Sequence, residues 1–251
     1  MHFRDKISRA AETNKTRIVL ALDLEDPDPE LLVNKSLRVL EDVKGSICAV
    51  KINRQLILAL GLRRVADTVL RFADNHSLPT IMDAKLNDVG HTNLFMARTY
   101  FETGFDAIIA SPIVGWENGL DTVFEAAGST DKAILLLTYM SNPGAEAFYS
   151  LRTMQPNGPS KPIFEIFTDL AIKWKAHGLI VGATKREIIS RVRDLTGGSL
   201  PIYSPGVGAQ GGDPRKTILA GSAYLIVGRS IYGASDCGKA AESIRRAAIT
   251  D

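Results

Sequence analysis

An alternation of short apolar runs with helix-like stretches constrains the fold of this chain more than any other feature. The runs have the length of strands and are apolar on consecutive residues, a pattern typical of parallel strands covered by helices. The eight expected strands are residues 17–24, 47–52, 79–85, 106–111, 132–139, 178–183, 200–205 and 223–228.

Eight strand–helix units in 251 residues predict a (β/α)8 TIM barrel of the α/β class, formed as a single domain over residues 1–251. A doubly wound open sheet is the alternative that the pattern leaves open. The connection from Met140 to Pro162 is long and rich in Pro, Gly and Asn, and the stretch from Gly206 to Gly212 is rich in glycine. Both are predicted to be active-site loops.

The overall composition argues against several classes of protein. The net charge is +2, from 30 basic and 28 acidic residues, and no long basic run indicates a nucleic-acid site. The first 15 residues lack the apolar core of a signal peptide, and no apolar run could cross a bilayer. Cys48 and Cys237 have no metal-binding or redox spacing. A cytoplasmic protein is therefore expected.

Charged residues collect where several of the expected strands end. Asp23 ends the first strand, Lys51 the second, and Asp83 and Lys85 the third, with Asp88 shortly after. In a barrel of this kind the carboxyl ends of the strands surround the active site. Asp83 and Lys85 are two residues apart, so both are expected to face the barrel axis. A structural network of ion pairs is the other interpretation of this cluster.

A glycine-rich loop follows the seventh expected strand. Gly206, Gly208 and Gly211 spell G-x-G-x-x-G, but a dinucleotide site would place this pattern after the first strand. Loops after the last two strands of a barrel commonly bind phosphate, because glycines let backbone N–H groups approach the anion. Arg229 adds a forked cation and Gln210 a neutral donor, so a phosphorylated small substrate is predicted.

Six segments together resemble the orotidine 5′-phosphate decarboxylase family, of the archaeal-like type. They are LALDL, VKIN, DAKLNDVGHTN, LLTYMSNPGA, SPGVGAQGGDP and IVGRSIYGASD, in this order along nearly the whole chain. The resemblance implies a (β/α)8 barrel that acts as a homodimer without cofactor or metal. It also implies conversion of orotidine 5′-monophosphate (OMP) to uridine 5′-monophosphate (UMP) and carbon dioxide, in de novo pyrimidine biosynthesis.

The resemblance also implies roles for individual residues. Lys85 would protonate C6 of the pyrimidine, Asp83 would lie beside the departing carboxylate, and Asp88 would be the third catalytic residue. Asp88 and Thr92 would reach the active site of the partner subunit. The substrate-binding residues that the resemblance implies are Asp23 and Lys51 at the ribose, Thr92, Ser141 at the pyrimidine, and Pro205, Val207, Gln210, Gly228 and Arg229 around the phosphate loop.

Two other functions fit parts of the pattern. Magnesium-dependent relatives, similar to hexulose-phosphate synthase and 3-keto-gulonate-phosphate decarboxylase, keep D-x-K-x-x-D but have an acidic ligand where this chain has Lys51. A lysine there would repel a cation. A barrel that binds a phosphorylated ligand without catalysis is the second alternative, although every charge that the chemistry needs is present.

Overall fold

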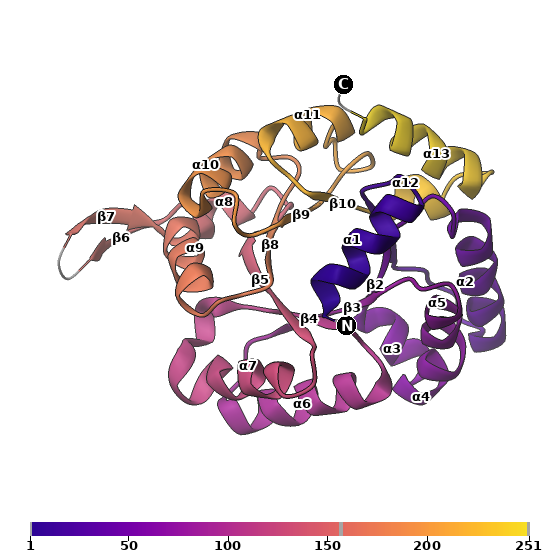
Figure 1. The fold of residues 1–251 in the computed structure, drawn as a ribbon, viewed down its shortest axis with the longest axis horizontal. Coiled ribbons are helices and arrows are strands. Elements are labelled where there is room, and N and C mark those ends of the chain that lie inside the picture. Colours follow the sequence, from indigo (N-terminus) through magenta and orange to yellow (C-terminus); the bar gives the residue numbers. More distant parts are fainter. Residues whose placement is uncertain (1, 156–157, 250–251) are drawn as a thin grey trace.

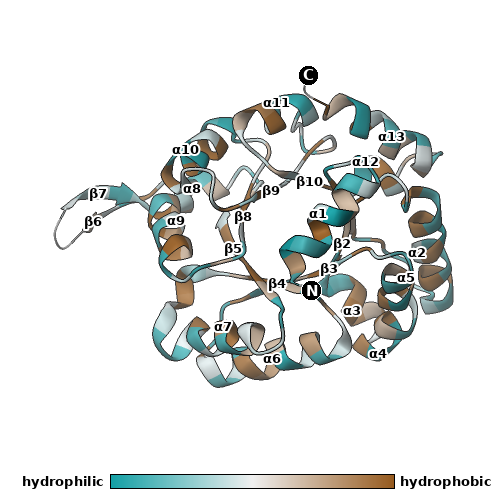
Figure 2. Ribbon diagram, in the orientation of Figure 1, coloured by the Kyte–Doolittle hydropathy of each residue, from teal (hydrophilic) through white to brown (hydrophobic). Residues whose placement is uncertain are grey.

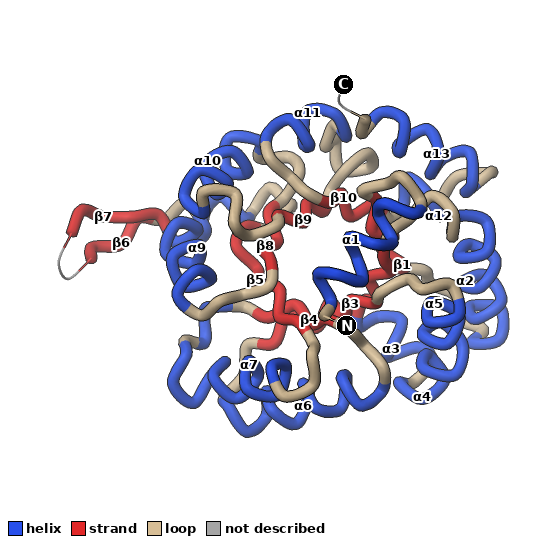
Figure 3. The backbone as a smooth tube through the Cα atoms, in the orientation of Figure 1, coloured by secondary structure: helices blue, strands red, loops and turns tan. Residues whose placement is uncertain are grey.

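Eight parallel strands close into a barrel in the computed structural model, which describes residues 2–155 and 158–249 (Figures 1 and 3). Their order around the barrel is β1-β10-β9-β8-β5-β4-β3-β2. The strands are β1 (Ile18–Leu22), β2 (Ala49–Asn53), β3 (Thr80–Leu86), β4 (Ala107–Ala110), β5 (Ala133–Tyr139), β8 (Gly178–Val181), β9 (Ile202–Pro205) and β10 (Tyr224–Val227). All eight predicted strands are confirmed, and closure of the sheet excludes the doubly wound alternative.

Helices surround the barrel on the outside (Figure 1). They are α2 (Pro29–Val43), α3 (Arg54–Leu60), α4 (Leu62–Val65), α5 (Arg71–Asn75), α6 (Gly90–Thr103), α7 (Asp121–Gly128), α8 (Ala145–Tyr149), α9 (Ile163–Lys173), α10 (Arg186–Thr196), α11 (Pro214–Ala220), α12 (Arg229–Tyr232) and α13 (Cys237–Ala247). The π-helical segments η1 (Ala66–Leu70) and η3 (Trp116–Leu120) and the 3-10 helix η2 (Pro112–Val114) join some of them. Figure 2 shows hydrophobic and hydrophilic residues alternating along these helices, as expected for helices with one buried side.

The strands are apolar throughout because they serve two cores. In β1, Ile18, Leu20 and Leu22 belong to the large cluster between strands and helices. Val19 and Ala21 belong to a second cluster that fills the barrel. Successive side chains of a strand point to opposite faces, so both faces here demand apolar residues. This arrangement explains the continuous apolar runs from which the barrel was predicted.

An N-terminal helix that the sequence analysis did not assign covers one end of the barrel. Helix α1 (Phe3–Thr13) lies across the ring of strands in Figure 1, and buries Phe3, Ile7 and Ala10 in the inner cluster. Lys6 reaches Asp106, just before β4, so α1 covers the end where the strands begin. The spacing of its three buried residues was the available signal, within an otherwise polar segment.

A two-stranded hairpin lies within the long connection between β5 and α9. Strands β6 (Arg152–Gln155) and β7 (Gly158–Pro162) are antiparallel, and Figure 1 shows them extending outward beyond α9. Residues 156 and 157 of the predicted loop lie outside the described residues. None of the helices in the described ranges has both the length and the apolar character needed to cross a membrane.

Candidate active site

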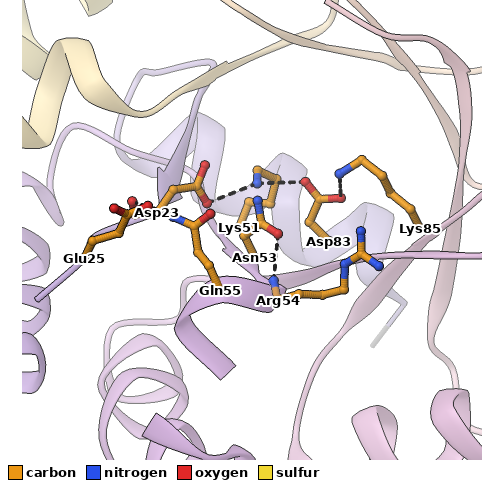
Figure 4. Close-up of polar contacts among 8 residues, drawn as sticks. All are labelled: Asp23, Glu25, Lys51, Asn53, Arg54, Gln55, Asp83 and Lys85. Atoms are coloured by element: carbon orange, nitrogen blue, oxygen red, sulfur yellow. Dashed lines mark hydrogen bonds and ion pairs between the residues drawn. The ribbon is translucent and has the colours of Figure 1, made fainter. Parts of the chain in front are cut away.

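Four charged residues form a continuous row at the carboxyl ends of β1, β2 and β3 (Figure 4). Lys51 Nζ lies 2.9 Å from Asp83 Oδ2 and 3.4 Å from Asp23 Oδ1. Lys85 Nζ donates to Asp83 Oδ1 at 2.5 Å. The order Asp23–Lys51–Asp83–Lys85 alternates in sign, so each charge has an opposite neighbour. The predicted clustering of these four side chains is what the structure shows.

Burial and charge act in opposite directions on the two central residues. Burial alone would raise the pKa of Asp83, but the ammonium groups of Lys51 and Lys85 outweigh it and hold that pKa below its usual value. Burial would likewise lower the pKa of Lys51, but Asp83 and Asp23 raise it above its usual value. Both residues are therefore charged at neutral pH. The side chain of Lys51 is 5% exposed and that of Lys85 is 26% exposed, so Lys85 is the cation that a ligand can reach.

The backbone at Lys85 departs from regular strand geometry. Its φ is +47°, in the left-handed region that is unfavourable for a side chain with a Cβ, and the pairing of β3 with β4 shifts register between Met82 and Leu86. Strained backbone of this kind costs on the order of 1–3 kcal/mol and persists where the surroundings enforce it. Simple strand alternation predicted the contact between Asp83 and Lys85 but not this bend.

The glycine-rich loop lies on the other side of the same pocket. Gly208 has a φ of +75°, and a Cβ at this position would collide with the side chain of Ser230. Ser230 Oγ in turn accepts a hydrogen bond from the backbone N–H of Ala209 at 2.8 Å, which holds the loop against the start of α12. The predicted residues of this region that line the pocket are Pro205, Val207, Gln210, Gly228 and Arg229.

The pocket contains further residues from the ends of other strands. Ser141, which follows β5, lines it as predicted, together with Met140. Asn53 and Tyr232 line it as well, and the sequence analysis did not single them out. Asn53 is two residues after Lys51, so strand alternation could have found it. Tyr232 lies one helical turn after Arg229, a spacing that brings two side chains to the same face of α12.

Two predicted site residues lie outside this pocket. Asp88 and Thr92 are not among the residues that line it. The Asp88 carboxylate accepts from the backbone N–H of Val89 at 2.7 Å, and Thr92 Oγ1 is 3.2 Å from His91 Nε2. The structure of one chain therefore does not bring them together with Asp83 and Lys85.

The acidic residues of the site have a lysine where a metal ion would need to be. Lys51 lies between Asp23 and Asp83 and forms ion pairs with both, so their negative charge is already compensated. Across residues 2–155 and 158–249, no group of three or more His, Cys, Asp or Glu side chains is arranged to hold a metal ion.

The family model described as "Orotidine 5'-phosphate decarboxylase / HUMPS family" matches residues 16–244. The chain belongs to this family. The resemblance stated from the six sequence segments is thus confirmed. Among curated relatives, an orotidine 5′-phosphate decarboxylase of Methanosarcina acetivorans is 35% identical over 229 residues, covering 91% of this chain and 93% of the relative. One of Pyrococcus abyssi is 35% identical over 227 residues, covering 90% and 96%.

Solved structures of orotidine 5′-phosphate decarboxylases share the fold. The enzyme of Methanocaldococcus jannaschii, complexed with the inhibitor BMP, superposes with a TM-score of 0.79 at 27% identity, covering 94% of this chain and 99% of that one. A Leishmania donovani UMP synthase gives a TM-score of 0.85 at 26% identity. This match covers 98% of the present chain but 55% of the synthase, so the barrel corresponds to part of that longer protein.

Proposed function

We propose that this protein decarboxylates OMP to UMP and carbon dioxide, a step of de novo pyrimidine biosynthesis. The observation that carries the proposal is one pocket that joins the row Asp23–Lys51–Asp83–Lys85 to Gln210 and Arg229. The row offers a positioned proton donor, and the opposite side offers contacts for a phosphate. The curated relatives named above, which are orotidine 5′-phosphate decarboxylases, support the same activity.

The chemistry needs a cation near the carbon that loses the carboxylate. When the C6–carboxylate bond breaks, carbon dioxide leaves and the electron pair remains on C6. The Lys85 ammonium, held by Asp83 at 2.5 Å, stabilises that charge and then transfers a proton to C6. Asp83, beside the substrate carboxylate, adds repulsion that is relieved when carbon dioxide leaves. Lys85 regains its proton from solvent before the next cycle.

Substrate binding is divided between the two sides of the pocket. We assign the ribose hydroxyls to Asp23 and Lys51, and the pyrimidine to Ser141. The phosphate belongs to Arg229 and Gln210, with Pro205, Val207 and Gly228 forming the wall beside them. Because the phosphate is remote from C6, its binding energy can be used to order loops around the reacting group.

We also propose that the single-domain barrel closes over its substrate with two loops. The glycine-rich loop from Gly206 to Gly212 lines the pocket, and so does the start of the connection from Met140 to Pro162. The hairpin later in that connection extends away from the barrel (Figure 1). Closure therefore belongs to the residues around Ser141 rather than to the whole connection.

The position of Asp88 and Thr92 supports a shared active site. Both lie outside the pocket of their own chain, yet the family resemblance assigns them to the substrate. We propose a homodimer in which each chain contributes these two residues to its partner's pocket. Two free cysteines, one of them buried, support a reducing compartment such as the cytoplasm.

The decisive experiment is to mix the protein with OMP and follow substrate absorbance, with UMP measured in parallel. Turnover is expected, and it should persist in a metal chelator because Lys51 occupies the space between the carboxylates. Strict dependence on magnesium would instead favour a sugar-phosphate decarboxylase or aldolase of the same family. Absence of turnover by folded protein would leave only a binding barrel and overturn the proposal.

A further inference from the structure

A second cavity, with a volume of about 490 Å³, lies at the end of the barrel where the strands begin. It is bounded by α1, by α5 and the chain that follows it, and by the end of α6, and it shares no lining residue with the catalytic pocket. Its volume is within the range of small-molecule sites. Its charged lining residues are Lys6, Arg9, Arg71, Lys132, Asp74 and Asp106.

The floor of this cavity is a buried carboxylate that is already fully engaged. Asp106 Oδ1 lies 2.6 Å from Lys6 Nζ and 3.8 Å from Lys132 Nζ. Asp106 Oδ2 accepts from the backbone N–H of Thr80 at 2.9 Å and from its hydroxyl at 3.2 Å. One carboxylate is thus shared by two lysines, so its single negative charge does not compensate both ammonium groups.

The other charged groups around the cavity offset this shortage of negative charge only in part. Burial lowers the pKa of Lys132, and the charge of Asp106 offsets this only in part. No ion pair or side-chain hydrogen bond is found for Arg9 within the described ranges. Arg71 forms only an exposed pair with Asp67, at 3.0 Å. Among the lining residues four cationic side chains face two carboxylates, and after Asp67 is counted as the partner of Arg71 an excess of one positive charge remains around the cavity.

The same cavity also offers groups for hydroxyls. Helices α5 and α6 end at its rim, where the last carbonyls, such as those of Ala73 and Phe101, already accept backbone N–H groups, so the polar side chains of the rim have to supply the contacts. Ser77, Thr103 and the Asp74 carboxylate lie on the same rim. A bare anion would use only the cations, whereas a phosphorylated molecule with hydroxyl groups would use both sets. We propose that this cavity binds a small phosphorylated metabolite that carries hydroxyls, of the nucleotide class.

This second site is independent of the proposed decarboxylation, and it would join elements that are far apart in the sequence. Lys6 and Arg9 belong to α1, Arg71 to α5, and Lys132 directly precedes β5. A phosphate bound among them would fasten the N-terminal helix to the barrel. Binding should therefore raise the melting temperature as well as give a binding signal.

The test is calorimetric titration with ATP, on wild-type protein saturated with UMP and on Arg229→Ala, whose catalytic phosphate site is weakened. We expect one ATP per chain in both, with affinity that falls as sodium chloride is raised. The double variant Arg9→Ala/Arg71→Ala should bind at least about tenfold more weakly, because it loses both exposed cations. Arg63→Ala is the matched control, since Arg63 also pairs with Asp67 but does not line the cavity.

Inorganic tripolyphosphate, titrated in the same way, separates charge from the hydroxyl contacts. ATP binding more tightly than tripolyphosphate would support a nucleotide-class ligand, and equal affinity would overturn that part of the proposal. No saturable binding of either probe would overturn the site. An equal loss of affinity in Arg63→Ala would also overturn it, because ATP would then be responding to general surface charge. Displacement of ATP by UMP would overturn it as well, because the two ligands would then share the catalytic pocket.

Discussion

Lys85 combines a partly exposed ammonium with a strained backbone, and it is the residue on which the proposed chemistry depends most. Its Nζ is held at 2.5 Å from Asp83, and its φ is +47°. We expect Lys85→Ala to reduce kcat by several orders of magnitude, because the same group stabilises the carbanion and supplies the proton. UMP binding, measured by calorimetry, should survive.

Lys175 provides a matched control for this substitution. It is also a lysine in the left-handed region, with a φ of +57°, and it is exposed far from the pocket. Lys175→Ala should keep normal turnover, while any cost of alanine at a positive φ would appear in both variants. If Lys85→Ala retained substantial kcat, the assignment of the proton donor would be wrong.

Arg229 is predicted to act on binding through the phosphate. Arg229→Ala should raise KM for OMP by about tenfold or more, because a charge-assisted contact to the phosphate is lost. Orotidine, which lacks the phosphate, should be turned over equally by wild type and variant. Arg215→Ala, an exposed arginine on α11, is the control in steady-state kinetics. A similar loss with orotidine would show that Arg229 acts in another way.

At the scale of single elements, the sequence predicted the eight barrel strands better than it predicted helix α1 or the irregular backbone at Lys85. The continuous apolar runs identified β1 to β5 and β8 to β10 because both faces of each strand are buried. Helix α1 was missed because only three of its residues are buried, in a segment that is otherwise polar. The bend at Lys85 was missed because a register shift depends on the neighbouring strand rather than on local sequence.

The contribution of α1 can be measured directly. Ile7 is 1% exposed and packs in the inner cluster with Val19 and Tyr203. Ile7→Ala should lower the free energy of unfolding by about 2–5 kcal/mol, through lost burial and a new cavity. KM for OMP should change little, because the pocket is at the other end of the barrel. Ile249→Ala, at a half-exposed position, is the control in denaturant unfolding.

His177 makes the contact between β5 and β8 sensitive to pH. Its Nδ1 accepts the backbone N–H of Ile134 at 3.1 Å, which requires a neutral ring. Burial lowers the pKa of His177, so the unfolded chain binds a proton more readily than the folded one. This stabilisation is present above about pH 6.5 and is lost as the pH falls below that value.

The measurement is the melting temperature of wild type and His177→Gln between about pH 5 and 8. Wild type should lose more stability than the variant as the pH falls through this range, since glutamine does not titrate. If the melting temperatures of the two proteins fell in parallel with pH, titration of His177 would not be the cause of the loss of stability. His91→Gln, in an exposed position on α6, is the control.

At the scale of the whole molecule, the active site that we propose to be shared between two chains makes a prediction about Asp88. Spacing placed Asp88 close to Asp83 in sequence, but the structure leaves it outside the pocket. Mixing Lys85→Ala with Asp88→Ala subunits, after reversible dissociation, tests where Asp88 acts. If it serves the partner, each mixed dimer has one intact site, and about a quarter of wild-type activity should appear.

The parent variants alone should remain inactive in that experiment. If Asp88 acted within its own chain, no mixed dimer would have an intact site and mixing would restore nothing. Lys85→Ala mixed with Asp83→Ala is the control, because both residues belong to the same chain's pocket and cannot complement each other. Recovery in that control would indicate exchange of more than these side chains.

The hairpin between β5 and α9 leaves and rejoins the barrel at nearly the same point, because Arg152 pairs with Pro162 at its base. The two ends of the hairpin therefore stay at the same positions on the barrel, whatever the length of the hairpin beyond this pair. Insertions in the hairpin are therefore expected to leave the arrangement of the catalytic pocket unchanged. An engineer could use this hairpin to display a peptide or reporter at a distance from the substrate, on a barrel that remains otherwise unaltered.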